Sequence, residues 1–366
     1  MGKYLSSFNI SFKNDKIIMI DIDTWIVAEW DIERENYKTI ARIMPIGGYG
    51  AASKLCFTIN CFIVGDLMYC VMRNTAQITV INLTTGKHYV CGKNYPIYKL
   101  SDLKYATAMQ IDNKIYLFPY MINQNIVIFD IKTNIYREIE SPIKMLNLDY
   151  RYDNYMVNSY ICNGNKIWFA VSGTNIIGVL DVANKEDSRY FSCGENSFLR
   201  LEGDKDNILA VGIGRKGLIS IDNADNWHTV INSNDTEIDN INAVIPIDQK
   251  LFVENLDGSA YIIFQDGEKV CIQLPDELKK VDNVRAVKNV PFSKCFYKND
   301  KIYMVPFASN GIVVIDINTL KSKYFCLEIS DDDVEAEYCK RQDMIYENRF
   351  YTLANYLDYI NELSID

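Results

Sequence analysis

The chain has 366 residues, of which 48% are hydrophobic and 23% charged, so it can bury a large core under an ordinary globular surface. Its formal net charge is −10 and no stripe of Lys and Arg interrupts the acidic balance, which argues against a nucleic-acid or anionic-membrane partner. No run approaches about 18 apolar residues, and the N-terminus lacks the regions of a signal peptide. We therefore expect a cytoplasmic protein.

A β-hairpin module recurs about every 48 residues, from the N-terminus to about residue 330. It starts with a Lys-Ile-aromatic strand and ends with an apolar strand closed by Asp or Asn, as in KIYLFPYMINQNIVIFDIKTN and KIYMVPFASNGIVVIDINTL. The first and last residues of the modules are, in chain order, Lys16 and Asp31, Asp66 and Asn82, Lys114 and Asp130, Lys166 and Asp181, Asn207 and Asp222, Lys250 and Asp266, and Lys301 and Asp316. Each module spans about 15 or 16 residues, whereas the connections between modules vary from about 26 to about 36. This pattern predicts a repeated scaffold that carries variable loops.

Each repeat contains four predicted strands. The first precedes a polar turn whose Asn, Asp and Gly residues suit a tight hairpin, as in ATAMQIDNK. The second is apolar almost throughout, as in IYLF and IWFAV, which is typical of a strand covered on both faces. The third ends in the recurring Asp, which we expect to accept hydrogen bonds from turn amides, and the fourth is more polar.

A strand-only repeat of this length is typical of a β-propeller, in which blades that cannot bury their own faces close into a ring. The sequence thus predicts an all-β fold with a single propeller over residues 1–330, of about seven four-stranded blades, with six or eight as alternatives. The repeats resemble the generic repeats of the WD40, Kelch and quinoprotein-like groups, and residues 220–227, SIDNADNW, resemble the Asp box of sialidase-type propellers. These resemblances imply a fold and a structural turn, and no particular activity.

Residues 331–366 depart from the repeat. They are predicted to form an acidic linker followed by a strand and a short C-terminal helix that starts near Thr352 and packs on the propeller. The alternatives are a surface for a partner or for self-association, and an incomplete eighth blade.

Loops between the second and third strands, and the connectors between blades, emerge on the same face of a propeller. We call this the long-loop face, because all the long, varied segments of the chain belong to it. Their Tyr, Arg and Lys content is common at protein interfaces. The candidate binding residues on this face are Trp25, Tyr49, Arg73, Tyr120, Arg215, Lys216, Glu254 and Phe307.

Two glycine-rich segments lie on this face. Residues 47–50, GGYG, are followed by no predicted helix, so an ordinary turn is favoured over a phosphate loop. Residues 212–217, GIGRKG, are typical of a hairpin loop, with contact of Arg215 and Lys216 to an anion as the alternative.

The sequence gives little support for a catalytic site or a metal site. The only histidines, His88 and His228, both lead into outer strands, away from the ring axis, and the ten cysteines form no CxxC pair and are expected to be mostly buried free thiols. No cofactor or metal is predicted. Carboxylates at or near the long-loop face are the remaining candidates for acid and base, and they are Asp21, Asp23, Glu254 and Asp257.

Two functions follow as hypotheses. The first is a non-catalytic propeller that recognises a protein partner or a ligand through its long-loop face. The alternative is a hydrolase or lyase acting on a polar small molecule or a glycan near the axis with carboxylate, Tyr and Arg groups. The abundance of Asn, Ile, Lys and Tyr suggests an AT-rich, bacterial genome.

Overall fold

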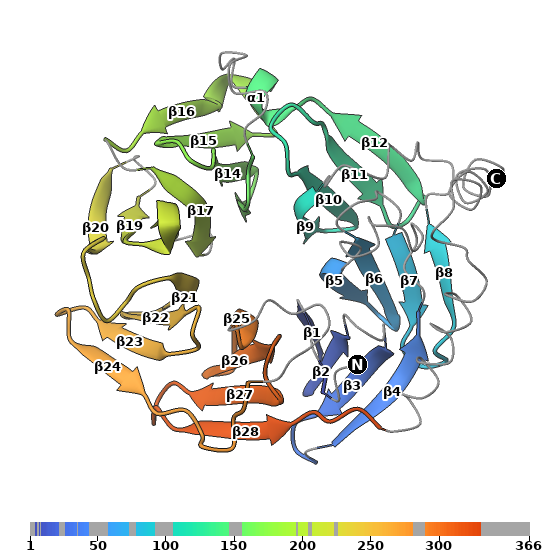
Figure 1. Ribbon diagram of the computed structural model, residues 1–366. Helices are drawn as coiled ribbons and strands as arrows, with labels where there is room; N and C mark the ends of the chain where they lie inside the picture. Colours follow the sequence, from blue (N-terminus) through green and yellow to red (C-terminus); the bar gives the residue numbers. More distant parts are fainter. Residues whose placement is uncertain are drawn as a thin grey trace, which may run out of the picture.

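Each predicted repeat forms a four-stranded antiparallel sheet, and seven such sheets are arranged around a common axis like the blades of a propeller (Figure 1). The computed structural model describes residues 4–5, 7, 9–21, 26–34, 36–43, 58–72, 78–91, 105–145, 156–194, 197–203, 207–222, 226–280 and 290–330. The all-β fold and the count of seven blades are confirmed. The predicted C-terminal helix and the rest of residues 331–366 lie outside the described residues.

The strands run in chain order from the axis to the rim of each blade. Blades 1 to 3 consist of β1 (Ile10–Lys13), β2 (Lys16–Ile20), β3 (Ile26–Asp31) and β4 (Asn36–Arg42); β5 (Thr58–Val64), β6 (Leu67–Met72), β7 (Ile78–Asn82) and β8 (His88–Cys91); and β9 (Tyr105–Ile111), β10 (Lys114–Pro119), β11 (Ile126–Asp130) and β12 (Ile135–Ile139). Blades 4 and 5 consist of β13 (Tyr160–Asn163), β14 (Lys166–Ala170), β15 (Ile176–Asp181) and β16 (Arg189–Ser192); and β17 (Phe198–Gly203), β18 (Ile208–Gly212), β19 (Leu218–Ile221) and β20 (Trp227–Ile231). Blades 6 and 7 consist of β21 (Ile241–Ile247), β22 (Lys250–Asn255), β23 (Ala260–Phe264) and β24 (Lys269–Ile272); and β25 (Phe292–Lys298), β26 (Lys301–Pro306), β27 (Gly311–Asp316) and β28 (Ser322–Cys326).

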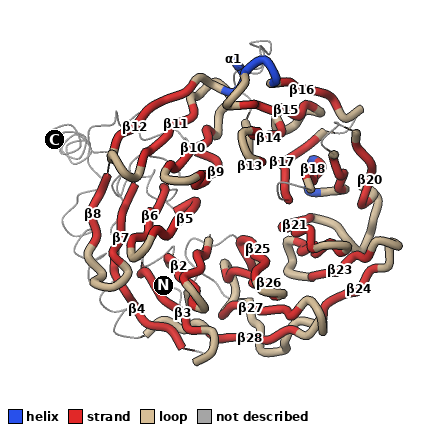
Figure 2. Tube along the Cα trace, turned by 180° about the vertical axis from the view of Figure 1, so that it is seen from behind, coloured by secondary structure: helices blue, strands red, loops and turns tan. Residues whose placement is uncertain are grey.

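Helix is scarce in the described part of the chain, where α1 (Pro142–Met145) is a single turn after blade 3 (Figure 2). No helix among these residues is long and apolar enough to cross a membrane.

The recurring Asp at the end of the third strand has the structural role predicted for it. The Asp130 carboxylate accepts hydrogen bonds from the amides of Lys132 and Thr133, both at 3.0 Å. The Asp316 carboxylate accepts equivalent bonds from Asn318 at 3.1 Å and Thr319 at 2.8 Å. These bonds lower the pKa of both carboxyls, that of the Thr133 or Thr319 amide contributing most. Each Asp therefore fixes the turn that leads to the outer strand.

Apolar packing between blades holds the ring together. One buried hydrophobic cluster lies between each pair of neighbouring blades. Alternate residues of a second strand serve different clusters: Tyr69 and Val71 pack against blade 3, whereas Met68 and Cys70 pack against blade 1. This explains the nearly continuous apolarity of these strands, because both of their faces are covered.

At the closure of the ring, the described strands of blade 7 (β25 to β28) and blade 1 (β1 to β4) each form a separate four-stranded sheet. The N-terminal segment crosses the joint, where the Leu5 amide donates to the Leu327 carbonyl at 2.8 Å and the Ser7 amide donates to the Pro306 carbonyl at 2.8 Å. In the same joint, the fully buried Trp30 of blade 1 packs edge-on against Phe325 of blade 7, with ring centroids 4.9 Å apart.

Polar side chains on the innermost strands add a second set of links. The Asn60 side chain of blade 2 accepts hydrogen bonds from the Ala108 amide at 3.0 Å and from the Thr107 hydroxyl at 3.1 Å, both on blade 3. Asn9 of blade 1 donates to the Ile59 carbonyl of blade 2 at 2.7 Å. Neutral amides thus satisfy backbone groups across the joints of the first three blades.

Candidate functional site

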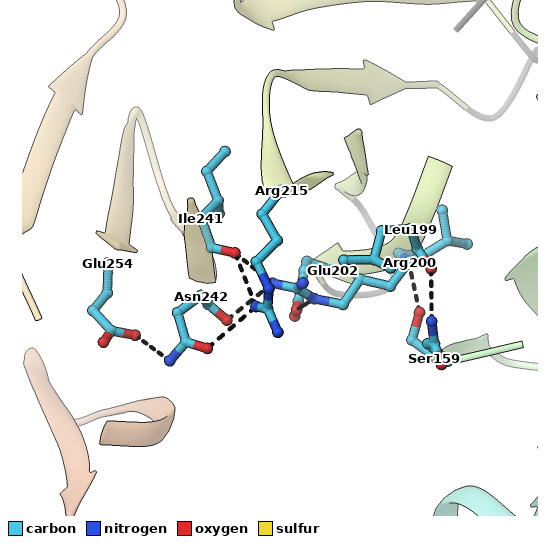
Figure 3. A network of polar contacts seen from close by, with 10 residues as sticks. Ser159, Leu199, Arg200, Glu202, Arg215, Ile241, Asn242 and Glu254 are labelled. Carbon is cyan, nitrogen blue, oxygen red and sulfur yellow. Dashed lines mark hydrogen bonds and ion pairs between the residues drawn. The ribbon is translucent and has the colours of Figure 1, made fainter. Parts of the chain in front are cut away.

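The candidate site lies at the long-loop end of blades 5 and 6, where two of the predicted binding residues meet (Figure 3). Arg215 comes from the loop between β18 and β19, and Glu254 is the penultimate residue of strand β22. Asn242, near the start of the innermost strand β21, stands between them. Its amide nitrogen donates to Glu254 Oε2 at 2.8 Å, and its amide oxygen accepts a bond from Arg215 Nη1 at 3.4 Å.

Glu254 occupies a position that is apolar in five of the other six blades and is Gly212 in blade 5. The fifth residue of the second strand is Ile20, Val71, Phe118, Ala170 or Val305 in five of them, and it is Glu254 in blade 6. The side chain is 0% exposed, and its Oε1 atom has no hydrogen-bond partner among the described residues. An ionisable side chain at this position is therefore not required by the packing of a blade.

Burial keeps Glu254 protonated at neutral pH. Desolvation raises its pKa to about 8, and the Asp257 carboxylate adds to the increase, whereas Asn242, the Arg200 charge and the Cys295 thiol act in the opposite direction. Burial likewise raises the pKa of Cys295, whose Sγ lies 3.9 Å from Glu254 Oε2. Glu254 is therefore a neutral hydrogen-bonding group near pH 7.

Two guanidinium groups converge beside this carboxyl. Arg215 Nη1 donates to the Ile241 carbonyl at 3.2 Å, and Arg200 Nη2 donates to the same oxygen at 3.3 Å. Arg200 also donates to the Asn242 carbonyl at 2.9 Å and forms an ion pair with Glu202, with Nε 2.6 Å from Oε1. Within the described ranges, no carboxylate forms an ion pair with Arg215.

The environment of Arg215 is unfavourable to its charge. Its pKa is lowered by burial and then by the positive charge of Arg200, whereas Glu202 and Glu254 act in the opposite direction. The backbone is also constrained, because Arg215 has φ 63° and the preceding Gly214 has φ 69°. A left-handed conformation is costly for a side chain as large as Arg, so the loop places this residue at the expense of local strain.

The loop itself is the hairpin loop predicted for residues 212–217. The Gly212 amide donates to the Gly217 carbonyl at 3.1 Å, and a Cβ atom on Gly212 would lie 2.1 Å from the Lys216 carbonyl oxygen. Only glycine fits at this close approach.

The other predicted binding residues do not join the cluster. Lys216 is exposed and pairs with Asp239 at 3.4 Å. Tyr120 is half-buried at the joint to blade 4, where its carbonyl accepts from the Val157 amide at 2.8 Å, and Phe307 is buried, with 6% exposure. Trp25, Tyr49 and Arg73 lie outside the described residues, as does the segment 47–50.

The remaining candidates for catalysis are scattered. Both histidines lie on outermost strands, His88 on β8 and His228 on β20. Asp257 is engaged in a turn, where its carboxylate accepts from the Ser259 amide at 2.8 Å, and Asp21 is fully buried at the end of β2. Asp23 lies outside the described residues. In the part of the chain that is described, no group of three or more His, Cys, Asp or Glu side chains is placed to hold a metal ion.

The described cysteines are free thiols, as predicted, and their burial varies more than expected. Cys70, Cys91 and Cys193 are buried, whereas Cys271 and Cys326, both on outermost strands, are exposed.

Three residues of the site, Arg200, Glu202 and Asn242, were not predicted from the sequence, because they lie on innermost strands and not on loops. A signal was present for Arg200. It pairs with Val211 as Asn60 pairs with Val71, each beside a shift in strand register, so a charge stands where blade 2 has a neutral amide. Alignment of the first strands in addition to the hairpins would have revealed it.

The fold and the site together define a seven-bladed β-propeller with a charged cluster on one face. The chain matches no protein-family profile and no curated protein. Among solved structures it is similar to virginiamycin B lyase from Staphylococcus aureus, with 13% identity, a TM-score of 0.54, and coverage of 76% of this chain and 87% of that one. A streptogramin B lyase is 11% identical, with a TM-score of 0.59 and coverage of 85% and 93%. The WD40 propeller domain of Doa1 is 10% identical, with a TM-score of 0.55 and coverage of 86% and 94%. Likeness at these identities shows the propeller fold alone.

Proposed function

We propose that this chain is a non-catalytic recognition propeller, which binds its partner or ligand on the long-loop face beside the axis at blades 5 and 6. The observation that carries the proposal is the convergence of Arg200 and Arg215 on one carbonyl oxygen, that of Ile241. Neither packing nor ring closure requires a second guanidinium there, since neutral amides such as Asn60 link the blades elsewhere. Functional side chains on loops above a rigid scaffold are the usual arrangement for binding.

Binding is favoured over catalysis by the placement of the ionisable groups. Glu254 is fully buried, so it does not reach a molecule outside the protein in this conformation. A histidine-to-alanine variant of the S. aureus virginiamycin B lyase is described as catalytically inactive, whereas both histidines of this chain lie on outermost strands. Neither histidine of this chain therefore lies beside the axis.

The proposal is tested by affinity capture with tagged protein. The site variant carries Arg215→Gln. The matched control carries Arg137→Gln, which removes the same charge on the outer strand β12. We expect a partner or ligand retained by wild type to be retained by the control and lost from the site variant. Equal retention by both variants would refute the long-loop end of blades 5 and 6 as the binding surface.

A second candidate function is an enzyme that uses Glu254 as a general acid, because a carboxyl whose pKa is about 8 holds a proton near neutral pH. It requires a movement that uncovers the carboxyl. The test is incubation with a metabolite extract and mass spectrometry. A compound consumed by wild type and untouched by the Glu254→Gln variant would favour the enzyme over the recognition module.

A further inference from the structure

The cluster at blades 5 and 6 holds more positive than negative charge, although the chain as a whole carries −10. Two guanidiniums share the Ile241 carbonyl, so their donating nitrogens lie within about two hydrogen-bond lengths of each other. We propose that Arg200 and Arg215 together bind a carboxylate group of the ligand. This inference rests on the proposed function and specifies the chemistry that the site recognises.

Like charges at such a distance repel, and partial burial strengthens the repulsion because less water screens it. Glu202 neutralises one of the two charges through its ion pair with Arg200. The other carboxyl that acts on Arg215, that of Glu254, does not neutralise the second, because burial keeps it protonated. An incoming anion would compensate this charge, which makes it the natural complement of the site.

Donor groups are also available to such an anion. The hydrogen bonds of Arg215 to described residues all come from Nη1, so its Nε and Nη2 groups have no hydrogen-bond partner in that part of the chain. A guanidinium binds a carboxylate best through two parallel N–H groups, and Nε with Nη2 forms one such pair. The buried Glu254 Oε1 also lacks a partner among the described residues, so the polar network is incomplete as it stands.

The charge balance selects the kind of anion. With Glu202 ion-paired to Arg200 and Glu254 protonated, the two arginines leave a single uncompensated positive charge. A carboxylate brings one negative charge, whereas phosphate brings between one and two at neutral pH and would leave the buried site with an excess. The carboxylate of a small acid and that of a peptide C-terminus share this chemistry.

The conformation of Arg215 is consistent with a site formed in advance of binding. Its φ of 63° is held between Gly214 and the close approach of Gly212 to Lys216. Strain kept at a single loop residue is often associated with a functional site. The loop thus fixes the guanidinium over Ile241 before the ligand arrives, which reduces the entropy lost on binding.

The test is calorimetric titration of the full chain with three probes, namely succinate, N-acetylglycine as a mimic of a peptide C-terminus, and inorganic phosphate. The variants are Arg215→Gln in the site and Arg137→Gln on β12, which removes the same charge at the rim. We expect saturable binding of a carboxylate probe by wild type and by Arg137→Gln, and at least about tenfold weaker binding by Arg215→Gln, as loss of a charge-assisted pair implies. The stronger of the two carboxylate probes identifies the source.

Three results would overturn the inference: no saturable binding of either carboxylate, equal weakening by both variants, or a preference for phosphate over both carboxylates. A failure here is distinguishable from failure of the proposed function. If the carboxylates do not bind while the capture experiment still separates the site variant from its control, the recognition surface stands and the carboxylate assignment falls.

Discussion

The joint of blades 2 and 3 and the joint of blades 5 and 6 are linked by different kinds of side chain. At the joint of blades 2 and 3, the neutral Asn60 satisfies backbone and hydroxyl donors. At the joint of blades 5 and 6, the equivalent residue of blade 5 is the charged Arg200, which donates to the Asn242 carbonyl, and Arg215 of the same blade donates beside it. Since a neutral side chain suffices to join blades, we attribute the two guanidinium charges of blade 5 to recognition. Unpaired or buried charge is costly, and proteins keep it mainly where it has a use.

The largest expected effect comes from Glu254→Gln. The folded pKa is raised to about 8 from 4.5, so the folded state retains a proton that the unfolded chain releases above pH 4.5. The stability of wild type should therefore fall as pH rises from 4.5 to about 8, by about 1.4 kcal/mol for each step of one in pH. Gln does not titrate, so the stability of the variant does not fall in this way. Between pH 4.5 and 8, the free energy of unfolding of the variant should therefore rise relative to that of wild type, by several kcal/mol in total.

Urea denaturation at a series of pH values measures this difference. Glu202→Gln serves as the control, because that carboxyl is ion-paired and partly exposed. A difference between wild type and Glu254→Gln that stays constant from pH 4.5 to 8 would show that Glu254 is ionised in the folded protein.

The next largest effect is expected at the joint of blades 2 and 3, which the neutral Asn60 links. Asn60→Ala removes the acceptor of the Ala108 amide and the Thr107 hydroxyl, and we expect a loss of about 1–3 kcal/mol with no effect on ligand binding. Thermal or urea unfolding measures it. Asn125→Ala, which loses an exposed bond to Glu138, should change stability by less than about 0.5 kcal/mol. Equal losses in the two variants would refute a role for Asn60 in joining the blades.

A smaller effect is expected at the turns of the outer strands. Asp316→Ala removes two amide acceptor contacts and should lower the unfolding temperature slightly at neutral pH. The folded pKa of Asp316 is lowered below 3.8, so its contribution is present above this value and is lost as pH falls through the folded pKa. Calorimetry from pH 2 to 7 checks this, and a difference that persists at the acid end would contradict the carboxylate role.

The repeat made most of the fold predictable. Strands buried on both faces leave a continuous apolar pattern, and a recurring Asp or Asn marks one turn in each blade, so the module starting at Lys114 and its counterparts share one sequence pattern. The long-loop face followed from topology, and with it Arg215 and Glu254. The convergence of the two arginine side chains could not be predicted from the sequence. That Arg200 and Arg215 share the Ile241 carbonyl depends on the register shift in β17 and on the left-handed backbone of Arg215, which no spacing in the sequence encodes.

The central claim is that the charged residues at blades 5 and 6 serve recognition and not the fold. The most direct test compares wild type with Arg215→Asn. The measurement is the change in unfolding temperature that a saturating carboxylate probe causes in each protein. Asn tolerates the left-handed backbone of this position, so the variant keeps the loop and loses only the guanidinium. We predict that the variant alone unfolds at the wild-type temperature or above it, and that the probe raises the unfolding temperature of wild type only, because a ligand stabilises the state that binds it. A variant that unfolds well below wild type, or one that the probe stabilises as much as wild type, would contradict the account.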